Sequence, residues 1–285
     1  MTAERDPQTG IETTGHSWDG IKELNNPLPR WWLWVLWVTV IWAIGYWIAM
    51  PTWPTITGFT GGLLGYSQRA VVADELEAAK AVHAPLNARI LATPLDRVRT
   101  DPELLSFALA GGRSAFLVNC AQCHGTGAAG GKGFPNLNDD DWLWGGTLAD
   151  IEHAIRFGVR SGHAEAREGD MPAFVKDQLL SEAEAWQIVY YVLDLAVGAP
   201  KRDSPAAQLF ADNCAACHGA DGKGDAKLGA PNLTDAIWLF GGDRNAIYAS
   251  VAQSRRGVMP GWQSRLDEAT IKKLAVYIHA LGGGR

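Results

Sequence analysis

The sequence predicts an all-α protein in which a single N-terminal transmembrane helix precedes two tandem repeats of one helical design. Two supporting observations are an apolar, uncharged run at 31–50 and two copies of Cys-x-x-Cys-His further along the 285-residue chain. The third is that no stretch of the repeats alternates apolar and polar residues with the β-branched content typical of a strand. In chain order we expect an N-terminal segment (1–30), the transmembrane helix (31–50), a linker containing a helix (51–103), the first repeat (104–199) and the second repeat (204–285).

The run from Trp31 to Met50 has the length of a membrane span. Its 20 residues, at about 1.5 Å per residue in a helix, would cover about 30 Å of hydrocarbon. A cleaved signal peptide is the alternative, but its apolar region is usually about 7 to 15 residues long and follows a short basic start. Here 30 residues precede the run, with five acidic and three basic side chains, so we predict a retained single-pass helix.

Basic residues near the span predict its orientation. Lys22 and Arg30 lie on its N-terminal side, whereas the first basic residue after it is Arg69. Positive charge is enriched on the cytoplasmic side of membrane helices, so we expect a cytoplasmic N-terminus. Tryptophans deep within the span, such as Trp37, favour packing against another membrane helix, because an indole N–H finds no water there.

The composition of the linker predicts one helix on the protein surface. Residues 71–90 are rich in Ala, Glu and Leu, and Asp101 with Pro102 begins the helix that follows. We expect the linker helix to space the repeats from the membrane or to contact partner proteins.

The two Cys-x-x-Cys-His runs, at 120–124 and 214–218, contain every cysteine of the chain. Two thiols on one helical turn can form thioethers with haem vinyl groups, and the adjacent imidazole can reach the iron. A zinc site would not require a His after each second Cys, and a thioredoxin-like site expects a preceding strand. The sequence therefore predicts two covalently bound haem c groups, attached at Cys120, Cys123, Cys214 and Cys217, with His124 and His218 as axial iron ligands.

Methionine is the usual sixth ligand of a haem that transfers electrons without binding substrate. Of the four methionines, Met1 starts the chain and Met50 ends the apolar run. The other two, Met171 and Met259, each follow a Cys-x-x-Cys-His run and precede a proline, which would stiffen the loop. We therefore expect Met171 and Met259 to be the remaining axial ligands.

The sequence leaves the pairing of methionine with iron open. Pairing within each repeat, His124 with Met171 and His218 with Met259, is simplest because each repeat would then be complete alone. If the two repeats pack face to face, they can exchange loops. Met259 would then bind the first iron and Met171 the second.

The chain repeats itself around the two runs. When the runs are aligned, a Phe and an Asn of the preceding helix match, and a Pro-Asn-Leu turn and an aromatic Gly-Gly run recur downstream. Each copy ends in a helix with apolar periodicity, at 183–195 and 268–281. The matched pairs are Phe116 and Phe210, Asn119 and Asn213, Pro135–Leu137 and Pro231–Leu233, and Trp142–Gly146 and Trp238–Gly242.

These repeats resemble the class I cytochrome c fold. The N-terminal region carries a second resemblance, in His-Ser-Trp-Asp-Gly-Ile-Lys-Glu-Leu-Asn-Asn-Pro-Leu-Pro-Arg-Trp-Trp at 16–32, Ile-Trp-Ala-Ile-Gly-Tyr-Trp at 41–47, Pro-Thr-Trp-Pro at 51–54 and Gly-Tyr-Ser-Gln-Arg at 65–69. This region is similar to that of the dihaem subunit, subunit III or the FixP/CcoP family, of cbb3-type cytochrome c oxidases. With the two repeats in order, the resemblance covers nearly the whole chain.

The resemblance implies an electron-transfer subunit without a catalytic centre of its own. Such a subunit accepts electrons from a donor cytochrome c and passes them toward the haem-copper oxygen-reducing centre. It implies as partners the haem-copper catalytic subunit and a monohaem cytochrome c subunit of the oxidase. The haem domains would face the periplasm from the bacterial inner membrane.

Two other functions are weighed against this one. A dihaem carrier for another respiratory or dehydrogenase complex would share the repeats but not the N-terminal sequence. A dihaem peroxidase needs one iron open to peroxide, whereas each repeat here offers a methionine. The net charge of −6 argues against nucleic acid as a partner.

Overall fold

The computed structural model describes residues 3–283. The chain divides into two compact units, residues 1–81 and 82–285. In the described residues the named elements are helices, apart from one two-stranded hairpin. The predicted all-α architecture, with one N-terminal membrane helix ahead of the repeats, is confirmed.

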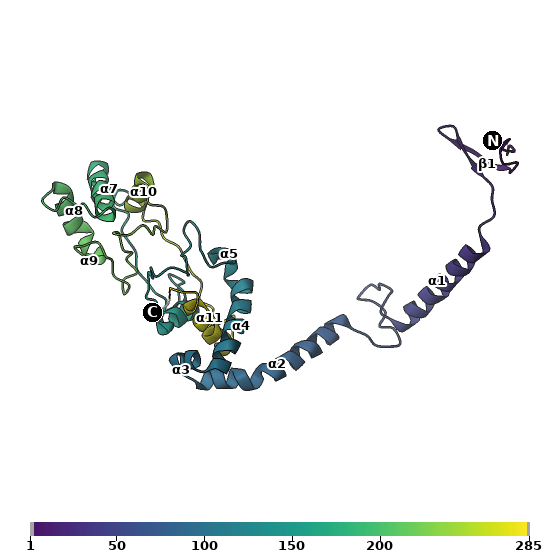
Figure 1. The fold of residues 1–285 in the computed structure, drawn as a ribbon, viewed down its shortest axis with the longest axis horizontal. Helices are drawn as coiled ribbons and strands as arrows, with labels where there is room; N and C mark the ends of the chain where they lie inside the picture. The colour runs from purple at the N-terminus through teal and green to yellow at the C-terminus, as the bar shows by residue number, and fades with distance from the viewer. Residues whose placement is uncertain (1–2, 284–285) are drawn as a thin grey trace. The chain divides into compact units, whose positions relative to one another are not determined.

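The N-terminal segment forms a β-hairpin that the sequence analysis did not predict. Strands β1 (Thr13–Trp18) and β2 (Ile21–Leu24) pair antiparallel (Figure 1). Asp19 and Gly20 join them with φ angles of 51° and 85°. Asp-Gly is a strong two-residue hairpin signal because both positions need positive φ. The strands themselves are short and largely exposed, so they show little apolar alternation.

Helix α1 (Arg30–Ala49) matches the predicted span to within one residue at each end. None of its residues is buried, and among the described residues it is the one helix long and apolar enough to cross a bilayer. The helix ends where the N–H of Met50 donates to the carbonyl of Tyr46, 2.8 Å away. The chain then turns back along the last turn of the helix before α2 begins.

Helix α2 (Gln68–Ala92) is the linker helix that its composition predicted. Its C-terminal end is attached to the second unit by Lys272. The Nζ of Lys272 donates hydrogen bonds to the carbonyls of Ile90, Leu91 and Thr93 at 3.3, 3.0 and 3.1 Å. A cation is favourable there because the last carbonyls of a helix lack partners and carry the negative end of its dipole.

The second unit contains the two repeats. Its longer helices begin at polar N-cap residues, among them Asp101 and Ser204, each followed by a proline, and the start at Asp101 was predicted from the sequence. The Cys-x-x-Cys-His runs lie in the short helices α5 and α9. The helices are α3 (Leu95–Thr100), α4 (Pro102–Asn119), α5 (Ala121–His124), α6 (Leu148–Phe157), α7 (Glu182–Ala196), α8 (Pro205–Asn213), α9 (Ala215–His218), α10 (Arg244–Gln253) and α11 (Glu268–His279).

The closing helix of each repeat packs into the core of the other repeat. Helix α11, which ends the second repeat, lies against α4 and α6 of the first, whereas α7 lies against α8 and α10 (Figure 1). The ranges predicted from the sequence, 104–199 and 204–285, remain predictions of where each repeat begins and ends. In space, neither range closes its own core. The first core contains Phe116, Ile151, Ile155, Leu274 and Ile278, and the second contains Ile188, Val192, Phe210, Ile247 and Val251.

Glycine permits the closest approach of α4 to α11. A Cβ at Gly112 would lie 2.4 Å from the carbonyl oxygen of Lys273 and 2.5 Å from the Cβ of Tyr277. At the neighbouring Gly111 a Cβ would meet only the flexible side chain of Lys273, 2.9 Å from its Cδ. The two adjacent glycines therefore differ in what a methyl group would displace.

We expect Gly112→Ala to lower the free energy of unfolding by about 1–3 kcal/mol, the usual cost of overpacking. Gly111→Ala is the matched control and should be neutral or stabilise by about 0.5–1 kcal/mol, because Ala favours helix over Gly. Urea unfolding followed by circular dichroism measures both. Equal effects of the two substitutions would contradict the packing of α11 on α4.

Candidate functional site

The first cysteine of each run lies between two helices, and the second cysteine and the histidine lie in the short helix that follows. Cys120 ends α4 with its N–H donating to the carbonyl of Phe116, and the N–H of His124 donates back to the carbonyl of Cys120 at 3.0 Å. In the second repeat, Cys214 and His218 make the same bond at 2.9 Å. This tight turn places both cysteines and the histidine of a run together, as attachment to one porphyrin requires.

The cysteines suit thioethers better than metal thiolates. The first cysteine of each pair is more buried than the second. Burial raises the pKa of the Cys120 thiol to about 11 and that of Cys214 to about 12. Thiolate is the form that binds zinc, so these sites disfavour it. Within residues 3–283 no group of three or more His, Cys, Asp or Glu could hold a metal ion.

Both histidines of the runs are held in one orientation by a backbone carbonyl. The Nδ1 of His124 lies 3.0 Å from the carbonyl oxygen of Pro135, and the Nδ1 of His218 lies 3.0 Å from that of Pro231. Burial lowers the pKa of both imidazoles, which favours their neutral form. A neutral imidazole that donates from Nδ1 leaves Nε2 to bind a metal. The repeated Pro-Asn-Leu turns therefore serve to orient the two candidate ligands.

The loop of Met259 is fixed to the first repeat. Met259 and Val159 exchange two backbone hydrogen bonds of 2.9 Å, and the N–H of Trp262 donates to the carbonyl of Ile155 at 3.0 Å. A Cβ at Gly158 would lie 2.3 Å from the carbonyl oxygen of Met259, so this approach requires glycine. The side chain of Met259 packs against the core that contains Phe116 and Cys120.

The loop of Met171 is fixed to the second repeat in the same way. The N–H of Phe174 donates to the carbonyl of Val251 at 3.1 Å, and the hydroxyl of Ser254 donates to the carbonyl of Met171. Met171 packs against the core that contains Phe210 and Cys214. Met171 thus lines the same cavity as His218, and Met259 packs against the core of the first repeat.

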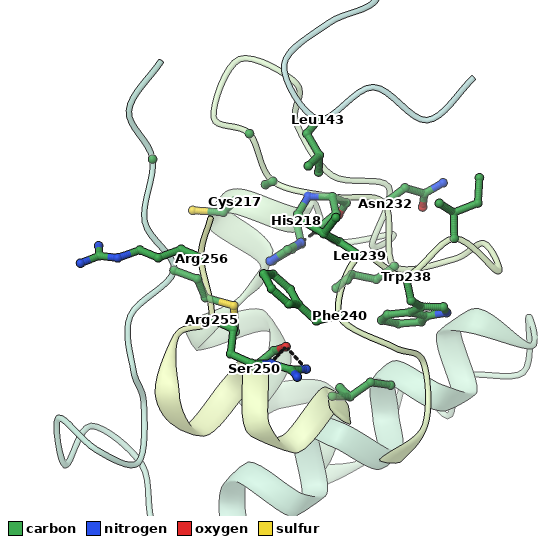
Figure 2. A pocket seen from close by; sticks show the side chains of 18 of the residues that line it. Leu143, Cys217, His218, Asn232, Trp238, Leu239, Phe240, Ser250, Arg255 and Arg256 are labelled. Carbon is green, nitrogen blue, oxygen red and sulfur yellow. Dashed lines mark hydrogen bonds between the residues drawn. The ribbon is translucent and has the colours of Figure 1, made fainter. Parts of the chain in front are cut away.

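A cavity of about 430 Å³ lies at the second run. Met171, Cys214, Cys217 and His218 all line it. Figure 2 shows His218 and Cys217 at one wall with Phe240 beside the imidazole. A chamber with two thiols, an imidazole and a thioether fits a haem c group. Its apolar walls include Ile188, Val192, Phe210, Leu233, Trp238 and Val251.

Arginines line the same cavity, and one of them, Arg160, was not singled out from the sequence. Arg160 donates from Nε to the carbonyl of Gly257 and from Nη1 to that of Gly169, at 2.7 and 2.9 Å. The guanidinium carbon of Arg255 lies 4.9 Å from the ring centre of Phe240. Burial lowers the pKa of Arg160. No sequence pattern marks Arg160, because its acceptors are carbonyls and one of them is 97 residues away.

The two repeats contact each other reciprocally beside the histidine-orienting turns. The ring of Trp144 packs directly on Gly229: a Cβ at Gly229 would lie only 2.2 Å from the ring atom Cζ2 of Trp144. In the alignment of the repeats, Phe240 matches Trp144 and Gly133 matches Gly229. A Cβ at Gly133 would lie 3.4 Å from the ring atom Cε1 of Phe240. The N–H of Gly133 also donates to the carbonyl of Leu239 at 2.8 Å.

Comparisons with known proteins agree with the repeats and the N-terminal region. Residues 10–57 match the family described as the N-terminal domain of cytochrome oxidase-cbb3, FixP. Residues 107–192 and 202–278 match the family described as cytochrome C oxidase, cbb3-type, subunit III.

Full-length relatives are similar along almost the whole chain. The cbb3-type cytochrome c oxidase subunit FixP of Bradyrhizobium sp. (strain ORS 278) is 52% identical over 99% of this chain and 99% of its own length. FixP of Bradyrhizobium diazoefficiens is 53% identical, with 99% of each chain covered. The subunit CcoP of Cereibacter sphaeroides is 51% identical, with 95% of each chain covered.

The tight contact at Trp144 can be tested with two glycine substitutions. Gly229 and Gly133 both have positive φ, 66° and 87°, so alanine costs about 1–2 kcal/mol of backbone strain at either position. At Gly229 the methyl group also overlaps Trp144, which should add about 1–3 kcal/mol. Urea unfolding should therefore show a larger loss for Gly229→Ala than for Gly133→Ala. Equal losses would contradict the contact.

Proposed function

The chain belongs to the FixP/CcoP family, subunit III of cbb3-type cytochrome c oxidases, and we propose that it carries electrons from a donor cytochrome c toward the haem-copper centre of such an oxidase. As a member of this family it is a membrane-anchored, haem c-binding, electron-transfer subunit that works in a complex with other oxidase subunits. The observation that carries the proposal is the presence of an oriented imidazole, a thioether and two thiols around one cavity.

Two haem c groups would be bound covalently, one at Cys120 and Cys123 and the other at Cys214 and Cys217. The two turns have the same backbone hydrogen bonds and the same imidazole orientation, which supports one group at each. When bound, haem c supplies an iron that gains or loses a single electron.

The axial ligands would pair across the repeats: His124 with Met259, and His218 with Met171. Met171 lines the cavity of His218, and Met259 packs in the core of Cys120. This is the exchanged arrangement, rather than the simpler pairing within each repeat. Its physical basis is the backbone hydrogen bonding that holds each methionine loop to the opposite repeat.

The residues of the chain would favour fast electron exchange by changing little between oxidation states. Hydrogen bonds from Nδ1 hold the imidazoles, and Pro172 and Pro260 stiffen the methionine loops. The apolar walls exclude water, which raises the reduction potential. The half-buried guanidinium of Arg160 adds positive charge at the cavity and further favours the reduced form.

We place the N-terminus in the cytoplasm and the repeats in the periplasm of a bacterium, with α1 in the inner membrane. Lys22 and Arg30 before α1 support this orientation. The partners would be the haem-copper catalytic subunit, the monohaem cytochrome c subunit and a donor cytochrome c. A dihaem peroxidase is not favoured, because a methionine packs in each core and no iron position is left to peroxide.

Purification tests the assignment to an oxidase. The tagged full-length chain, extracted from its own membranes in mild detergent, should bring with it haem b and copper in addition to haem c. An untagged preparation controls for non-specific retention. Recovery of haem c with a different enzyme's cofactors would contradict the proposed partner.

The ligand pairing is tested in single-haem variants. With Cys214 and Cys217 both changed to Ala, one haem c should remain, on the first run. In that background Met259→Ala should abolish the near-infrared sulfur-to-iron absorption band, because the thioether of the first iron is lost, whereas Met171→Ala should leave it. The background variant itself, low-spin and with the band intact, controls for folding. The reverse result would establish pairing within each repeat.

A further inference from the structure

After α1 the chain folds back and contacts the C-terminal end of this helix. The N–H of Leu63 donates to the carbonyl of Ile48 at 2.9 Å, and the N–H of Leu64 donates to that of Ala49 at 3.0 Å. These carbonyls belong to the last turn of α1, where a helix provides no partner. In hydrocarbon an unpaired carbonyl is unfavourable, so this contact completes the end of the span.

Glycine is required for the contact. Gly62 has φ of 67°, and a Cβ there would lie 2.5 Å from the carbonyl oxygen of Ala49 and 2.6 Å from the carbonyl carbon of Met50. Any other residue would therefore meet backbone, which cannot rotate aside.

Within the returning segment, residues 51–67, three backbone N–H groups are paired across the turn between Trp53 and Thr60. The N–H of Thr55 donates to the carbonyl of Gly58 at 2.7 Å, and the N–H of Thr60 donates to that of Trp53 at 2.9 Å. The N–H of Trp53 donates to the hydroxyl of Thr60 at 3.1 Å. Pro51 and Pro54 contribute no N–H. These bonds and the two prolines reduce the number of unpaired N–H groups that the loop would carry to the membrane interface.

The loop contains several threonines, and its large apolar side chains are exposed. No charged residue occurs between Arg30 and Arg69 in the sequence, so the loop extends the uncharged region of α1. Ile56 is fully exposed, and Leu63 is 83% exposed. Contiguous exposed apolar side chains mark an interaction surface. The others are Trp53, Phe59 and Leu64.

Because the loop is continuous with α1, the lipid bilayer is the partner that its exposed apolar side chains would contact. The hydrogen bonds at Leu63 and Leu64 fix the loop beside the last turn of the helix, at the depth where that turn meets the membrane interface. The ring of Trp47, on α1, contacts Trp53 of the loop edge-on at 5.0 Å. Tryptophan is the residue that prefers this interfacial depth.

We propose that residues 51–67 form a second membrane-anchoring element, an interfacial loop whose Ile56, Phe59 and Leu63 side chains insert into lipid beside the end of α1. The loop would fix where α2 leaves the membrane surface. It would also hold α1 at a constant depth.

A spin label at Ile56→Cys tests the insertion. The full-length chain is reconstituted in phospholipid nanodiscs without other subunits, and collisions of the nitroxide with oxygen and with a water-soluble nickel chelate are measured. The native cysteines are expected to be bound to haem, so the introduced thiol is the one that reacts. Ile41→Cys on α1 serves as the lipid-exposed control, and Val82→Cys on α2, apolar and 74% exposed, as the aqueous control.

The label at Ile56 should resemble the label at Ile41, with high oxygen and low nickel collision rates, whereas the Val82 label should show the reverse. Adding Gly62→Val should raise the nickel collision rate at Ile56 toward that at Val82, because the loop can no longer contact α1. Unchanged haem content shows that the repeats still fold.

Nickel accessibility at Ile56 equal to that at Val82 would overturn the proposal. Shielding that appears only when the other oxidase subunits are added would also overturn it, since the surface would then bind protein rather than lipid. Continued shielding in Gly62→Val would show that the contact with α1 does not set the depth of the loop.

Discussion

The structure of the repeats depends on backbone hydrogen bonds that hold each methionine loop against the opposite repeat. Met259 pairs with Val159 just beyond the end of α6, and Phe174 bonds to Val251 near the end of α10. Because the chain continues from each loop into a closing helix, these bonds determine where α7 and α11 can pack. The exchange of helices between the cores, the cavity at His218 and the close contact at Gly112 all follow from this arrangement.

One consequence is that neither repeat can form a complete core without the other. The first core needs α11, and the second needs α7, so loss of either would expose apolar side chains in both. A second consequence concerns the linker. Lys272 caps α2 from α11, so the helix that leads from the membrane is attached to the second repeat as well as the first. Because each closing helix packs into the other core, the two proposed electron-transfer centres lie in one compact unit, which suits transfer between sites at constant separation.

Sequence patterns of short range were predictive here. The apolar helix Arg30–Ala49, the linker helix and the helix start at Asp101 all lie where the sequence predicted them. The hairpin at Thr13–Leu24 was missed, although Asp19-Gly20 signalled it. The roles of Arg160 and Gly62 could not be predicted from the sequence, because each residue contacts backbone atoms that become its neighbours only in the folded chain.

The sequence by itself determined the chemistry of this protein: which thiols and imidazoles lie together, which thioethers are available, and which segment enters the membrane. Those properties depend on residues a few positions apart, whose spacing a helix or turn converts directly into geometry. The tertiary structure alone decided which core receives each methionine loop and closing helix. Two similar repeats offer nearly equivalent local interactions for either choice, so the decision is made by packing and hydrogen bonds between residues about 80 to 100 positions apart, which no local pattern records.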